Sequence, residues 1–189
     1  AGAISLDVFG FVTLDGSFAF KKATGDFTLA DATTLEDVPY LAIGASIETA
    51  TVGAGSVGLE LSDIEVAMVL VSDTKGNNTG ATPVLTDDVS YTAIRAQVTD
   101  AEIVGITGLT VSVTDFALEI NQSKNNDGTA GATVLDFDDG NDPNLLALEV
   151  ATGPSTTATI DLDGGEGQLL QVAGAISLDV FGFVTLDGS

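Results

Sequence analysis

Apolar and polar residues alternate along almost the whole chain, which is typical of β-strands whose two faces differ. Ile64, Val66, Met68 and Leu70 give the clearest example. Further strands are predicted at 3–14, 18–29, 41–47, 57–61, 91–98, 103–106, 109–113, 116–120, 134–137, 145–150, 158–162 and 169–172. No stretch of ten residues combines a 3.6-residue period with helix caps, so the sequence predicts an all-β protein.

Turn signals separate several of these strands. Asp15-Gly16 is predicted to be a turn, because Asp-Gly favours the backbone angles that tight turns require. Two polar loops are predicted at 75–82 and 123–132. Ser or Thr followed by Asp also recurs after an apolar residue, at irregular intervals along the chain. We expect this pattern to mark bends, because both side chains bond nearby backbone groups.

The chain ends as it begins. Residues 1–17 and 173–189 both read AGAISLDVFGFVTLDGS, so the sequence that starts at Ala1 starts again at Ala173. Identity over this length predicts a tandem array, in which 1–172 is one repeat unit and 173–189 starts the next, identical unit. The aromatic residues Phe9, Phe11, Phe18 and Phe20 alternate along predicted strands. We expect all four to be buried, and Phe9 and Phe11 to be buried in both copies of the repeated segment except where an end of the structure leaves a copy bare.

The side chains opposite the large apolar residues are mostly Ala, Ser, Thr or Gly. Strands with one bulky and one small face suit closely stacked layers or coils. The irregular spacing of the Ser/Thr-Asp pairs does not fit a strict nonapeptide repeat. The predicted architecture is therefore an elongated tandem-repeat rod, for which a β-solenoid is favoured over an antiparallel β-sandwich.

Charge limits the possible partners. The chain has 28 acidic and 5 basic residues and a net charge of −23, which disfavours nucleic acid and anionic lipid. It has no apolar run long enough to span a bilayer, so we expect no membrane insertion. Because it lacks His and Cys, the most common general bases and nucleophiles are missing, and we expect no enzyme.

Hard cations suit such a surface, and calcium is the candidate. The oxygen-rich stretch LDFDDGNDPN supplies the candidate ligands Asp136, Asp138, Asp139, Asn141 and Asp142. Weaker clusters lie at 161–166 and 125–127. The alternative interpretation is that all three are solvated turns, because Asp-Gly and Asn-Asp form turns without a metal.

Four segments carry a family resemblance: GAISLDVFGFVTLDGSFAFKK, LAIGAS, LTVSVTDFALEIN and ATIDLDGGEGQLLQVAG. They resemble repeats of very large bacterial tandem-repeat surface proteins, described as adhesin-like or haemolysin-type calcium-binding repeat proteins. The resemblance implies an extracellular or cell-surface location and a structural or adhesive role, with no catalytic motif.

The leading hypothesis is a structural subunit of an extracellular fibre that associates with itself along the fibre axis, with lateral bundling as a further option. The alternative is the stalk of a cell-surface adhesin, stabilised by calcium. The spatial relation between residues 1–17 and 173–189 distinguishes a rod from a folded-back pair: a rod requires a translation or screw along one axis.

Overall fold

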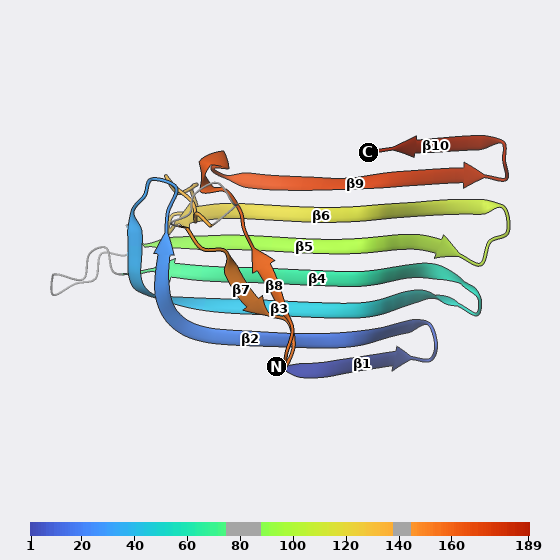
Figure 1. The fold of residues 1–189 in the computed structure, drawn as a ribbon, viewed down its shortest axis with the longest axis horizontal. Coiled ribbons are helices and arrows are strands. Elements are labelled where there is room, and N and C mark those ends of the chain that lie inside the picture. Colours follow the sequence, from blue (N-terminus) through green and yellow to red (C-terminus); the bar gives the residue numbers. More distant parts are fainter. Residues whose placement is uncertain (75–87, 138–144) are drawn as a thin grey trace.

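The computed structural model describes residues 1–74, 88–137 and 145–189 and confirms an all-β protein. Eight strands form one open antiparallel sheet in the order β1-β2-β3-β4-β5-β6-β9-β10 (Figure 1). Their bounds are β1 (Gly2–Val8), β2 (Val12–Thr28), β3 (Thr34–Ala54), β4 (Val57–Asp73), β5 (Val89–Val104), β6 (Leu109–Asn125), β9 (Leu169–Val180) and β10 (Val184–Gly188). A separate hairpin joins β7 (Leu148–Ala151) to β8 (Thr157–Ile160), and a short 3-10 turn, η2 (Gly164–Glu166), precedes β9.

Neighbouring strands of both sheets pair antiparallel wherever the structure describes them. This pairing leans away from the β-solenoid that the spacing favoured, because β-helices stack their coils in parallel. The β7–β8 hairpin adds a second layer over one part of the large sheet (Figure 1).

The strands are longer than predicted. The runs 57–61 and 64–70 both belong to β4, and 109–113 and 116–120 both belong to β6. In each strand the apolar positions change from odd to even residue numbers at a Ser/Thr-Asp pair. Asp63 and Asp115 there have φ of 49° and 52° and leave the pairing with both neighbouring strands. In these two strands the Ser/Thr-Asp pair therefore marks a bulge, not a corner, and the bulge keeps the apolar side chains on one face.

The predicted turn at Asp15-Gly16 is wrong. Both residues lie inside β2, where the pairing with β3 shifts by one residue, and the chain turns instead at 9–11. Gly16 is required for close approach of two backbones: a Cβ there would lie 2.4 Å from the carbonyl oxygen of Ser46. The Asp-Gly pair thus serves a bulge between long strands.

The β7–β8 hairpin packs on small residues of the sheet. Ala42, Ala67 and Ala93 are buried, and a Cβ on Gly44 would lie 2.3 Å from the carbonyl oxygen of Ala151. We call the side that carries the hairpin the front face. Small side chains there let the second layer approach the sheet, which explains the contrast between small and bulky faces seen in the sequence.

The end of the β2–β3 hairpin closes the core by curling across the sheet (Figure 1). The Ala30 N–H donates to the Val134 carbonyl (3.0 Å), and the Asp136 N–H donates to that of Thr28 (2.9 Å). Leu135 and Ile160 are fully buried in the resulting cluster. The core therefore occupies only the half of the sheet that lies under the hairpin.

The other half, toward the β1–β2 and β9–β10 turns, has two contrasting faces. Cross-strand register places one set of aliphatic side chains on the back face, opposite the hairpin, because directly paired residues share a face. The set continues from Phe18 along β2, where Ala19 faces the hairpin, and from Val172 along β9. This back patch comprises Ile4, Leu6, Val8, Val12, Leu14, Ala50, Val52, Ala54, Val57, Leu59, Leu61, Ala101, Ile103, Leu109, Val111, Val113, Ile176, Leu178, Val180, Val184 and Leu186. The front of the same half carries Ser, Thr and acidic side chains, such as the bonded pairs Thr13–Thr51 and Ser177–Asp187.

Candidate functional site

The two identical segments lie at opposite edges of one sheet. The first forms β1 and the start of β2, and the second forms the end of β9 and β10 (Figure 1). β1 and β9 stand six places apart in the strand order. Because neighbouring strands are antiparallel, an even number of steps gives them the same direction. The copies are thus displaced across the sheet and are not folded back on one another.

Both copies pair in the same register. Leu6 lies opposite Leu14 and Val8 opposite Val12 in the first copy. Their counterparts pair in the same way in the second: Leu178 with Leu186, and Val180 with Val184. Each copy is therefore the same hairpin, placed against a different neighbour.

Each copy lacks the neighbour that the other has. Phe9 is 94% exposed at the β1 edge, whereas its counterpart Phe181 is 57% exposed. Phe181 lies against the turn that precedes β6, where its N–H donates to the Gly108 carbonyl (2.6 Å). The second aromatic position shows the opposite: Phe11 is 58% exposed beside β3, where its carbonyl accepts from Gly53, whereas Phe183 is 90% exposed. The covered position of Phe181 and the covered position of Phe11 together show the surroundings that one copy would have with a neighbouring strand on both sides.

The prediction that the phenylalanines are buried is wrong. Phe9 and Phe11 lie at a hairpin turn, and Phe18 and Phe20 remain 40% and 68% exposed within β2. The alternation correctly placed the last two on one face of a strand, but the β7–β8 layer covers the opposite face, where Ala19 is buried.

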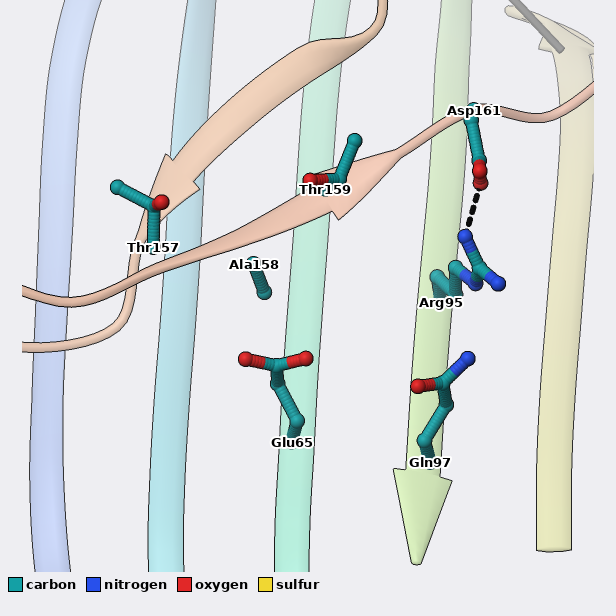
Figure 2. A pocket seen from close by; sticks show the side chains of 7 residues that line it. All are labelled: Glu65, Arg95, Gln97, Thr157, Ala158, Thr159 and Asp161. Atoms are coloured by element: carbon teal, nitrogen blue, oxygen red, sulfur yellow. Dashed lines mark hydrogen bonds and ion pairs between the residues drawn. The ribbon is translucent and has the colours of Figure 1, made fainter. Parts of the chain in front are cut away.

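A polar pocket lies where β8 crosses β4 and β5 (Figure 2). Its lining residues are Glu65, Arg95, Gln97, Thr157, Ala158, Thr159 and Asp161. The Arg95 guanidinium pairs with Asp161 at the end of β8 and lies 3.6 Å from the Glu119 carboxylate on β6. With its amide oxygen turned toward Arg95, Gln97 accepts from Nη2 (3.0 Å) and Nε (3.2 Å).

The Arg95–Asp161 ion pair links the end of β8 to β5 of the sheet. Arg95 is the one arginine of the sequence, and two carboxylates already balance its charge. The pocket therefore offers no free cation for an anionic ligand. The sequence patterns considered above do not identify Arg95. The feature that could have identified it is that it is the one arginine of an acidic chain and lies within a predicted strand.

The calcium candidates are only partly described. Asp136 accepts a hydrogen bond from the Gly164 N–H (2.8 Å), which joins the first predicted cluster to the second. Asp138, Asp139, Asn141 and Asp142 lie outside the described residues. Within residues 1–74, 88–137 and 145–189, no group of three or more acidic residues is arranged to hold a metal ion. The calcium site remains a prediction.

The weaker acidic clusters form turns. Asp163 caps η2 by accepting from the Gly165 N–H (2.6 Å). Asp127 accepts from the N–H and the hydroxyl of Thr129, and these bonds hold the pKa of its carboxyl below the ordinary value. In both places the carboxylate is engaged by its own turn.

No family description, curated protein or solved structure matches this chain. In the described part of the chain, no helix has the length and apolar character needed to cross a membrane. The arguments below therefore rest on the geometry of the chain itself.

Proposed function

We propose that this chain is a structural subunit of a fibre in which tandem copies of the unit 1–172 extend one antiparallel sheet. One observation carries the proposal: segments 1–17 and 173–189, identical in sequence, form the same hairpin at both edges of the sheet, in the same direction and register. A unit that presents its own first hairpin at its far edge supplies the start of the next unit there.

The repeat adds six strands, because β9 takes the place of β1 after six steps. At about 4.8 Å between strands, each unit lengthens the sheet by about 29 Å. The width of the ribbon follows from strand length: the 17 residues of β4 span about 56 Å at about 3.3 Å per residue. The expected object is a ribbon whose strands run across its long axis.

Joining units covers the edges that are bare in one unit. β10 offers the side that β2 uses to pair with β3, and β1 offers the side that β9 uses to pair with β6. Stability then accumulates through contacts between nearest neighbours, as in other repeat proteins. An open edge remains only at the two ends of the array.

The resemblance to bacterial surface repeats adds an extracellular, cell-surface location to the proposal, and the stalk of an adhesin remains the alternative role. A stalk requires the same ribbon with a binding domain attached elsewhere. The ribbon is therefore the feature to test first.

The test compares chains of two, four and six units by small-angle X-ray scattering and electron microscopy. We expect the length to grow by about 29 Å per unit at constant width. The control carries a flexible Gly-Ser linker between Val172 and Ala173, which interrupts β9. Chains that lengthen as flexibly linked particles with and without the linker would refute the proposal.

A further inference from the structure

We infer that the back face of the sheet is a self-association surface, on which a second copy of this chain packs back to back to form a two-sheet sandwich. The alternating side chains of β4 show that this face lacks a cover. Ala67 and Val69 face the β7–β8 hairpin and are 1% and 0% exposed. Val66 and Met68 alternate with them on the back and are only half-buried, although β4 is an interior strand.

The apolar surface extends far beyond the back patch. Beyond the patch, the paired residues on the back remain apolar or glycine through the rows that contain Ile47, Phe18 and Phe20. Polar side chains begin at the next row, which contains Lys22 and Gln122. A contiguous apolar surface of this size marks an interaction site.

The total surface of the chain points to a missing partner. The chain exposes 10896 Å², whereas a compact monomer of this mass exposes about 8,400 Å². The excess fits a sheet that is covered on one side over half of its length and bare on the other side. Burial of apolar area is the main force that closes such faces.

The area of the back face is sufficient for a stable dimer. The six strands from β2 to β9 extend over about 29 Å at about 4.8 Å per strand. Residues 57–68 of β4 extend over about 40 Å at about 3.3 Å per residue. The footprint is therefore about 1,150 Å² per copy, whereas stable interfaces bury about 800 Å² per partner.

Charge favours a like partner in spite of the net charge of −23. The paired acidic residues of these rows lie on the front, as Glu60, Asp100 and Glu102 do. Two copies that meet through their backs therefore keep these carboxylates on the two outer surfaces, in water. A polar or charged partner gains nothing from an aliphatic face.

The second layer of the molecule leaves room for this contact. The β7–β8 hairpin and the curled end of the β2–β3 hairpin both pack on the front, where Phe27, Leu29 and Ile160 share one core (Figure 1). Two backs can therefore meet at the usual distance of about 10 Å between packed sheets, with their strands about 30° from parallel.

The proposed ribbon also selects its partner. If tandem units continue one sheet, the apolar back repeats every six strands along the ribbon. A partner must then offer an apolar face of the same length and period, and a second ribbon does so unit for unit. Pairing of ribbons rests on the proposed function, whereas the dimer of the single chain does not.

Sedimentation velocity of the 189-residue chain tests the inference. We expect a concentration-dependent species of twice 19.0 kDa. Val66→Lys combined with Leu118→Lys should weaken the dimer at least about 100-fold, because it buries unpaired charges in the contact. The matched control is Ser62→Lys with Ser112→Lys. It adds the same charge to the same two strands on the front, opposite acidic residues of β5, and should leave the dimer intact.

A second measurement does not depend on the tolerance of the sheet for Lys. The chain has no cysteine, so Met68→Cys places a single thiol on the back and Ser112→Cys places one on the front. When about nine-tenths of the chain is dimeric, reaction of the back thiol with a maleimide should slow about tenfold by mass action. The front thiol should react at the same rate at every protein concentration.

Three results would overturn the inference. The first is a chain that stays monomeric at high micromolar concentration, and the second is a chain that binds phosphatidylcholine vesicles as a monomer through this face. The third is a back variant that dimerises as tightly as the front control, which would place the contact at the sheet edges. The tandem array does not depend on this contact, so a monomeric single chain would leave the proposed ribbon standing.

Discussion

A chain of two units tests whether neighbouring units share one sheet or fold separately. It consists of residues 1–172 followed by residues 1–189, so that the second copy of the repeated segment gains its own β3 neighbour. The comparison is with the single 189-residue chain. If the sheet is continuous, the joint between the units adds stability that neither unit has alone.

The structure provides the size of this gain. Phe183 should fall from 90% exposed to the 58% of Phe11, which removes about 65 Å² from water for a side chain of about 200 Å². Val184 and Leu186 are 54% and 53% exposed, whereas their counterparts Val12 and Leu14 are only partly exposed. These two contribute about 60 Å² more, and about 125 Å² in total corresponds to about 3 kcal/mol.

Urea unfolding followed by circular dichroism measures the gain. With a slope of about 2 kcal/mol/M per unit, about 3 kcal/mol spread over two cooperative units raises the midpoint by about 0.7 M. The slope should also increase, because both units unfold together. An unchanged midpoint with the slope of a single unit would show independent domains and refute the continuous sheet.

Two substitution pairs test the packing of the sheet and the core. Gly16→Val should destabilise the chain by about 2 kcal/mol or more, because its Cβ would meet the backbone at Ser46. Gly188→Val changes the same residue of the second copy, has nothing within 4 Å and should be neutral. Equal effects of the two substitutions on thermal unfolding would contradict the described pairing. Ile160→Ala should cost about 2–5 kcal/mol because the side chain is fully buried, whereas Leu146→Ala, at 82% exposed, should change little; a small loss for Ile160→Ala would mean that β8 does not cover the sheet.

Period-two alternation was sufficient to predict the all-β class, because it depends only on which residues face each side of a strand. It failed to predict strand length. In β4 the apolar positions pass from Leu61 to Ile64 without a turn, and the change in phase was interpreted as two strands. The reason is tertiary: Asp63 bulges out of the pairing with β3 and β5, so the apolar positions change phase in the sequence while they stay on one face of the sheet.

The errors in the candidate site also have a tertiary cause. Alternation placed Phe18 and Phe20 on one face, but no local pattern shows which face a distant hairpin will cover. The repeated segment, in contrast, was identified from identity alone. Its position at the two edges of the sheet needed the strand order, which depends on pairing between residues far apart in the sequence.

The distance between equivalent positions of the two copies tests the central claim most directly. Ser5 and Ser177 occupy the same place in the two copies, and the chain has no cysteine to interfere with labelling. Nitroxide labels on Ser5→Cys and Ser177→Cys should give a narrow electron–electron distance distribution centred near about 29 Å, six strand spacings of about 4.8 Å. A distance of about 10 Å, as between two hairpins packed face to face, or a broad distribution, would mean that the two copies do not occupy opposite edges of one sheet and would contradict the account.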